Sequence, residues 1–159
     1  MKFWPVIILL TGCSLFISGP DQPKTAKDTR YTISYVKNNW FQKLNNKSDY
    51  VFENIKDSRI FLSNSFCDEF QEEKLDRLAQ NIFKNIKNFN LKKSEYITFK
   101  NREAFWSEGD GLVDGVKVHL ILMNTRRNNC YFDFISITPS NIQPDSNSFD
   151  EFLNSVVFR

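Results

Sequence analysis

The feature that most constrains the fold is a series of extended segments in the C-terminal half of the chain. Residues 116–123 alternate, with Val116, Val118, Leu120 and Leu122 against Lys117, His119, Ile121 and Met123. This two-residue period is typical of a strand with one apolar face. Similar segments are predicted over 96–100, 104–107 and 131–138, separated by turns at 101–102, 109–115 and 125–129. Four consecutive strands predict an antiparallel meander.

The N-terminal half carries further strand signals. Residues 31–36 alternate in the same way, and the segments 50–54 and 59–63 flank Lys56-Asp57-Ser58 as a hairpin. Between them, Trp40, Phe41 and Leu44 predict a short helical turn or an aromatic plug over the core.

Two helices are predicted. The first runs from about Phe66 to Phe89, with Ser65 as its cap and an apolar stripe at helical spacing. The second is short and C-terminal, with Ser148 and Glu151 as a capping box. We therefore expect an α+β fold, a twisted antiparallel sheet of about six to seven strands packed against one long helix and a short C-terminal helix.

This layout resembles the superfamily that includes the photosystem II protein PsbP and the Ran-binding Mog-type proteins. The elements that carry the resemblance are Tyr31–Tyr35 followed by Trp40, the helix after Ser65, the strands 102–106 and 116–122, and the closing segment 149–157. The resemblance implies a twisted antiparallel sheet between helices. Members of the superfamily act mostly as binding or assembly modules, so it also favours a non-enzyme.

The N-terminus carries a candidate lipidation site. Lys2 precedes an apolar run over residues 3–10, and Leu10-Thr11-Gly12-Cys13 follows. These residues resemble the lipobox of bacterial lipoproteins, which implies cleavage before Cys13, a diacylglycerol thioether and acylation of the new amino terminus by a fatty acid such as palmitate.

Two other interpretations of this leader are weaker. A membrane-spanning helix needs about 20 apolar residues, more than residues 3–17 offer. Ordinary secretory cleavage after Ser18 or Gly19 would place Phe16 or Ile17 where a small residue is required.

The chain thus divides into a signal peptide (1–12), a lipid anchor and flexible tether (13–29) and one α+β domain (30–159). Ser14 stands where an aspartate would resemble an inner-membrane retention signal, so the implied location is the outer membrane, facing the periplasm. The lipid on Cys13 makes the membrane one expected partner.

The formal charge is only +2, from 21 basic and 19 acidic residues, so no general field attracts nucleic acid or an anionic membrane. We expect another envelope protein as the second partner. In an oxidising compartment Cys67 and Cys130 are candidates for a disulfide, and the alternative is two separate buried thiols.

Little in the chain points to catalysis. His119 is its one histidine, and no HExxH, CxxC, GxSxG or P-loop pattern occurs. We interpret His119 as structural and residues 109–115 as a turn rather than a phosphate or calcium loop. No catalytic residue, metal ligand or cofactor is therefore predicted.

Asp133 stands within an apolar strand and needs a polar partner if it is buried. With Trp106, Trp40 and Tyr96 it forms the candidate binding set, for a lipid, sugar or peptide.

The leading hypothesis is a lipid-anchored binding or assembly module. The alternative is a small-ligand or lipid pocket between sheet and helix near Trp106 and Asp133. A hydrolase that uses Asp133 with Glu103 or Glu108 ranks third.

Overall fold

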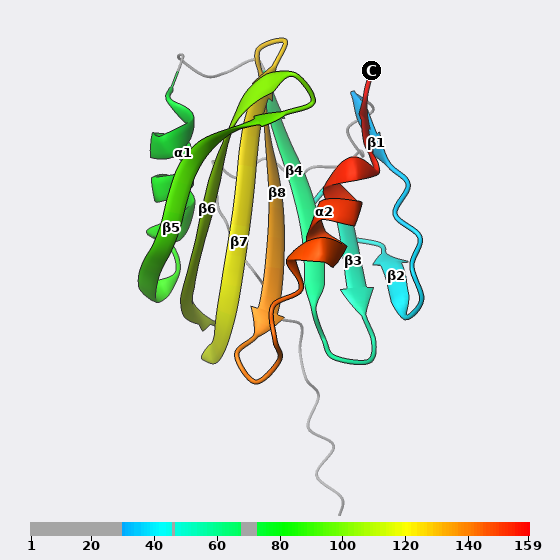
Figure 1. Ribbon diagram of the computed structural model, residues 1–159, viewed down its shortest axis with the longest axis vertical. Coiled ribbons are helices and arrows are strands. Elements are labelled where there is room, and N and C mark those ends of the chain that lie inside the picture. Colours follow the sequence, from blue (N-terminus) through cyan, green and yellow to red (C-terminus); the bar gives the residue numbers. More distant parts are fainter. Residues whose placement is uncertain (1–29, 46, 68–72) are drawn as a thin grey trace, which may run out of the picture.

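The architecture of the chain is shown in Figure 1, a computed structural model that describes residues 30–45, 47–67 and 73–159. The predicted leader, the lipidation site at Cys13 and the tether over 13–29 lie outside the described residues. Within the described ranges, no helix is long and apolar enough to cross a bilayer.

The described residues form one seven-stranded antiparallel sheet in the order β2-β3-β4-β8-β7-β6-β5, and β1 pairs separately with β9. The strands are β1 (Tyr31–Ile33), β2 (Trp40–Lys43), β3 (Tyr50–Asn54), β4 (Ile60–Cys67), β5 (Lys87–Phe99), β6 (Arg102–Val113), β7 (Val116–Arg127), β8 (Cys130–Pro139) and β9 (Val156–Phe158). The helices are α1 (Leu75–Phe83) and α2 (Ser146–Asn154). The α+β class, the antiparallel sheet and the hairpin of β3 and β4 are confirmed.

Three two-residue turns connect β5 to β8 as a meander. Each turn places both central residues at positive φ, which matches the twist of the strands. The residues are Lys100 (48°) and Asn101 (61°), Asp114 (50°) and Gly115 (81°), and Asn128 (49°) and Asn129 (59°). Asn, Asp and Gly adopt this conformation at low cost, which explains five of the six positions.

Each face of the sheet supports its own apolar cluster. Leu122 belongs to the cluster under α1, and its neighbour Met123 belongs to the cluster under α2, β1 and β9. We call these the α1 face and the α2 face. In Figure 1, α2 and β1 lie on one side of the sheet, and α1 lies beside β5 and β6.

The cluster on the α2 face is mainly aromatic. The Phe61 ring lies at its centre, stacked on Trp40 with centroids 4.1 Å apart and within 5.7 Å of the rings of Tyr35, Phe149 and Phe152. These rings come from four separate segments of the chain, so aromatic packing joins α2 and the β1–β2 connection to the sheet.

The prediction of one long helix over 66–89 is wrong. Strand β4 continues through Phe66 to Cys67, α1 covers only Leu75–Phe83, and β5 begins at Lys87. Residues 68–72 lie outside the described part of the chain. Ser65, the predicted cap, lies in β4, where its hydroxyl donates to Asp49 at 2.6 Å.

The error has a physical cause in Ile86 and Phe89, which continue the helical spacing of the α1 stripe. In the structure both side chains lie over β6, where a Cβ on Gly109 would come within 2.7 Å of Phe89 and one on Gly111 within 2.6 Å of Ile86. The two glycines leave room for these side chains. The chain after α1 therefore pairs with β6 as strand β5 instead of continuing the helix.

Two local predictions are also wrong. Residues 109–111 belong to β6 rather than to a turn, and only Asp114-Gly115 reverses the chain. Trp40 begins an edge strand instead of a helical turn, and only Trp40 of the predicted aromatic plug is buried, because Phe41 and Leu44 are exposed.

Candidate binding pocket

A pocket of about 400 Å³ opens at the end of the sheet where β3 turns into β4. Its walls come from the β1–β2 connection, the β3–β4 turn and the first turn of α2. The charged residues among its lining are Lys37, Lys56, Arg59, Asp57 and Asp145. Three segments distant in the sequence thus form one open pocket, lined mainly by polar and charged residues together with Trp40.

The β3–β4 turn is held by its own side chains. The Asn54 side-chain oxygen accepts from the backbone N–H of Lys56 at 2.9 Å, and Asp57 accepts from that of Arg59 at 3.3 Å. Ser58 adopts a left-handed φ of 58°. Such local bonds are typical of Asn and Asp in turns. They fix the direction in which Arg59 leaves the backbone.

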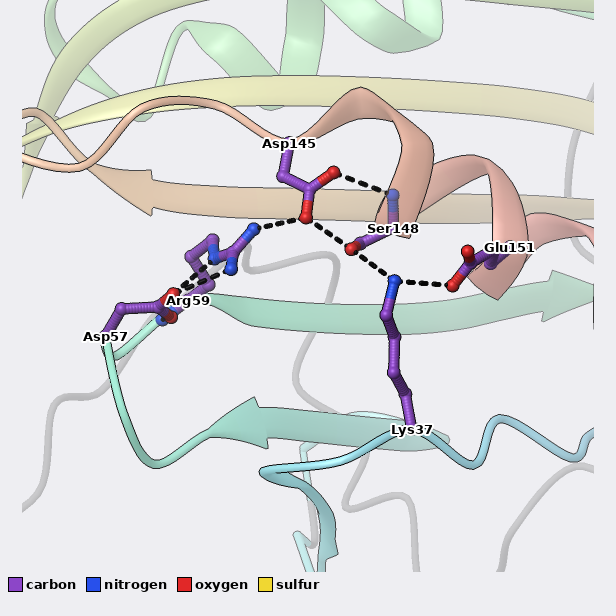
Figure 2. A network of polar contacts seen from close by, with 6 residues as sticks. All are labelled: Lys37, Asp57, Arg59, Asp145, Ser148 and Glu151. Atoms are coloured by element: carbon purple, nitrogen blue, oxygen red, sulfur yellow. Dashed lines mark hydrogen bonds and ion pairs between the residues drawn. The ribbon is translucent and has the colours of Figure 1, made fainter.

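Arg59 bridges two carboxylates in the wall of the pocket (Figure 2). Its guanidinium donates to Asp57 at 2.6 and 2.9 Å and to Asp145 at 2.8 Å. Only 14% of its side chain is exposed. The hydrogen bonds from Arg59 hold the pKa of Asp57 below its ordinary value, and those to Asp57 raise the pKa of Arg59. All three groups are therefore charged at neutral pH.

Asp145 also caps α2. Its side chain accepts from the backbone N–H of Ser148 at 3.0 Å and from the Ser148 hydroxyl. Burial acts to raise the pKa of Asp145, but the bonds from Ser148 and Arg59 outweigh it and lower the value to about 2. The predicted capping box of Ser148 and Glu151 is wrong, because the cap lies three residues earlier.

Ser148 and Glu151 bind a cation instead. The Lys37 ammonium donates to the Ser148 hydroxyl at 2.9 Å and to Glu151 at 2.7 Å, as Figure 2 shows. Lys37 comes from the β1–β2 connection, so this contact ties that connection to α2. The hydroxyl of Ser148 joins the two halves of the network, since it accepts from Lys37 and donates to Asp145.

Trp40 forms the apolar part of the lining. One side of its ring stacks on Phe61, and the Arg59 guanidinium lies 5.8 Å from its centroid. Tyr35 packs edge-on against it at 5.6 Å. Burial, reinforced by the charge of Glu151, raises the pKa of Tyr35 to about 12, so its phenol is neutral. The pocket therefore lies directly above the aromatic cluster.

We predict that Asp145→Asn makes stability less dependent on pH. The pKa of about 2 lies below the value of about 3.9 in an unfolded chain, so the charged form stabilises the fold above about pH 4. This contribution is lost as the pH falls from about 4 to about 2. The side chain is 35% exposed, and after allowance for screening we expect a loss of about 1 kcal/mol.

Asparagine retains the helix cap and removes only the charge. Urea unfolding of both proteins across this pH range measures the difference in their free energies of unfolding. Parallel pH profiles of the two proteins would contradict the assignment.

The four residues of the predicted binding set lie apart. Trp40 lines the pocket, whereas Trp106 packs on Phe149 of α2 at 5.7 Å. Tyr96 lies on the α1 face, where its hydroxyl donates to the carboxylate of Asp76 in α1 at 3.1 Å. Asp133 is buried between Asn64 and Asn124, its partners in the sheet. Because Asp133 is on the α1 face and Trp106 on the α2 face, they cannot line one pocket.

The carboxylates of the hydrolase hypothesis are separated in the same way. Glu108 pairs with Ile121 of the α2-face cluster and is thus on the face opposite to Asp133. Glu103 shares the face of Asp133 but is exposed, while Asp133 is buried. Neither Glu103 nor Glu108 therefore shares a cavity with Asp133.

Three other residues singled out from the sequence, His119 and two cysteines, make structural contacts. His119 contacts Asp110 through Nδ1 at 2.9 Å, on the strand beside it. Cys67 and Cys130 are joined by a disulfide and lie directly opposite each other on β4 and β8. Among the described residues, no group of three or more His, Cys, Asp or Glu side chains is arranged to hold a metal.

The sequence did not predict Lys37, Arg59 and Asp145 as pocket residues. The only local signal was Asp145-Ser146-Asn147-Ser148, in which Asp145 is as good a helix cap as the chosen Ser148. Arg59 and Asp145 are 86 residues apart, and no sequence period links them.

The fold and pocket define an α+β protein with a PsbP-like fold. The cyanobacterial PsbP (CyanoP) of Synechocystis sp. PCC 6803 is similar, with a TM-score of 0.57 at 14% identity over 91% of this chain and 99% of that one. LpqN, described as involved in cell envelope biogenesis of Mycobacterium tuberculosis, has a TM-score of 0.57 at 7% identity over 80% and 82%.

A Bacteroides thetaiotaomicron protein has a TM-score of 0.60 at 12% identity over 82% of this chain, which spans 45% of that longer protein. No protein-family model and no curated protein matches the sequence. At these identities the similarity establishes the fold alone.

Proposed function

We propose that this chain is a lipid-anchored protein of the bacterial envelope whose domain is a non-catalytic binding or assembly module. The anchor is the lipid on Cys13, and the domain faces the periplasm from the outer membrane. Two similar folds support this proposal, since LpqN is involved in cell envelope biogenesis and CyanoP is a PsbP protein.

The observation that carries the proposal is the polar pocket formed by Lys37, Arg59 and Asp145. Its charges are fixed by one another before any partner arrives, which lowers the entropic cost of binding. Lys56, Asn38 and Asn39 add hydrogen-bonding groups at the same opening. Such a lining fits a polar segment of another envelope protein, with backbone carbonyls and acidic side chains as acceptors.

The space between sheet and helices does not favour the alternative of a small-ligand pocket. Among the described residues, apolar side chains of the two clusters pack between the helices and the sheet, including Phe149 and Phe152 under α2 and Ala79 and Ile82 under α1. The candidate residues for that pocket, Trp106 and Asp133, are on opposite faces.

The test is co-purification of the tagged full-length protein from detergent-solubilised envelope after mild crosslinking. We expect one stoichiometric companion with the wild type. The double variant Asn38→Arg/Lys56→Glu adds bulk and reverses a charge at the opening, without touching the Arg59 ion pairs, and should reduce its yield at least about tenfold.

Two controls accompany this experiment. Lys84→Glu repeats the charge reversal of Lys56→Glu at the end of α1, away from the pocket, and should retain the companion. Cys13→Ser tests the contribution of the anchor. A companion that the pocket variant retains would exclude the pocket as the binding site, and an acylated protein recovered alone would contradict the assembly role.

A further inference from the structure

Several strands reach one end of the sheet together. Cys67 at the end of β4 pairs with Cys130 at the start of β8, which also pairs with Arg127 at the end of β7. The Arg30 guanidinium, just before β1, donates to the Cys130 sulfur at 2.9 Å. The backbone N–H of Arg159 donates to the carbonyl of Arg30 at 2.8 Å, so β9 ends here too. This end, uppermost in Figure 1, is where the chain enters the domain.

Among the described residues, the cations at this end include Arg30, Lys100, Arg102, Arg127 and Arg159, and we call it the basic end. Aromatic rings contact two of them. The Arg127 guanidinium lies 5.4 Å from the centroid of Phe158, and the Lys100 ammonium lies 5.4 Å from that of Phe99.

The two rings are themselves 6.4 Å apart, and Phe99 pairs with Arg102 across the β5–β6 turn. Through these contacts, Lys100, Arg102 and Arg127 lie around two partly buried rings.

The alternation of the strands separates these cations from the acids nearby. Arg102 is two residues from Ala104 on β6, and Arg127 is two residues from Thr125 on β7, so both arginines lie on the α2 face. Glu103 projects from the opposite α1 face. Within the part of the chain that the structure describes, no carboxylate forms an ion pair with Lys100, Arg102 or Arg159. Among the described residues, this end is therefore locally basic although the protein has little net charge.

The position of this surface relative to the anchor indicates its partner. Arg30 follows Cys13 by 17 residues, and even fully extended a chain of that length reaches no more than about 60 Å. The basic end is the part of the domain to which this chain attaches. Cations around partly buried aromatic rings are suited to the boundary between anionic headgroups and acyl chains.

We propose that the basic end docks on a bilayer of anionic phospholipid and orients the anchored domain. This inference rests on the lipid anchor of the proposed function. The electrostatic attraction between the basic end and anionic phospholipid does not require the acyl chains, so it can be measured with unacylated protein.

The experiment uses the full-length chain with Cys13→Ser, which cannot be acylated, and measures sedimentation with vesicles. We expect binding to phosphatidylcholine vesicles that contain phosphatidylglycerol, much less to phosphatidylcholine alone, and a decrease as ionic strength rises. Adding Lys100→Gln, Arg102→Gln and Arg159→Gln should weaken the binding about fivefold per cation, on the order of 100-fold together.

The matched control removes three cations elsewhere, with Lys84→Gln, Lys87→Gln and Lys117→Gln, and should bind like the parent. Equal losses in the two triple variants, or equal binding to both vesicle types, would overturn the proposal. Circular dichroism verifies folding, and Lys100→Glu alone, on an exposed turn, tests the same surface if the triple variant unfolds. The acyl mass of wild-type protein tests the anchor separately from this surface.

Discussion

Replacing Phe61 with alanine is expected to lower the free energy of unfolding by about 3–5 kcal/mol, the usual cost of removing a large ring from a core. Phe61 is 1% exposed and contacts the rings of Trp40, Phe149 and Phe152. Its loss leaves a cavity that these rings from β2 and α2 can fill only in part. Urea denaturation followed by circular dichroism measures the change.

Phe41→Ala is the matched control, since the same side chain is removed from edge strand β2, where it is 54% exposed. We expect this variant to lose less than about 1 kcal/mol. Because the Phe61 ring stacks on Trp40 in the pocket lining, Phe61→Ala should also reduce the yield of the companion that co-purifies through the pocket. Similar losses of stability in both variants would show that Phe61 is not the centre of the core.

Removal of the disulfide by Cys67→Ala and Cys130→Ala should cost about 4 kcal/mol in the chain-entropy model. The bond closes a loop with a sequence separation of 63 residues and so restricts the unfolded chain. The pairing of β4 with β8 continues for seven further residue pairs beyond it, so we expect the folded structure to persist in the double variant.

Denaturation with and without dithiothreitol measures this effect. Wild-type protein should be destabilised by the reductant to the level of the double variant, and the double variant should not respond to it. A wild-type protein with no response to complete reduction would contradict a stabilising role for the bond.

The sequence predicted those parts of the fold that depend on local chemistry. The alternation over 116–123 and the Asp114-Gly115 turn were sufficient to predict strand β7, and Lys56-Asp57-Ser58 predicted the β3–β4 hairpin. The long helix was wrong because helical spacing continued beyond Phe83 by coincidence. Whether Ile86 and Phe89 extend a helix or pack over two glycines depends on a strand that lies later in the chain.

The candidate site depended still more on tertiary contacts. Trp40 was the one member of the predicted set that lies in the pocket, and it was chosen as a large aromatic residue. Arg59 and Asp145 look like ordinary surface charges in the sequence, and they become a pair only when the β3–β4 turn meets the start of α2. The separation of Trp106 from Asp133 follows from strand register, which alternation alone does not fix between strands.

Strand β8 runs between the two surfaces that carry the proposals. Its ten residues begin at Cys130, beside the basic end, and finish at Pro139, shortly before Asp145 of the pocket. At about 3.3 Å per residue the strand measures about 30 Å. A domain that rests on the bilayer by its basic end therefore holds its pocket at a fixed height above the lipid. In the proposed arrangement, that height would select partners, since a segment lying flat on the membrane would be out of reach and one that projects away from it would meet the opening directly.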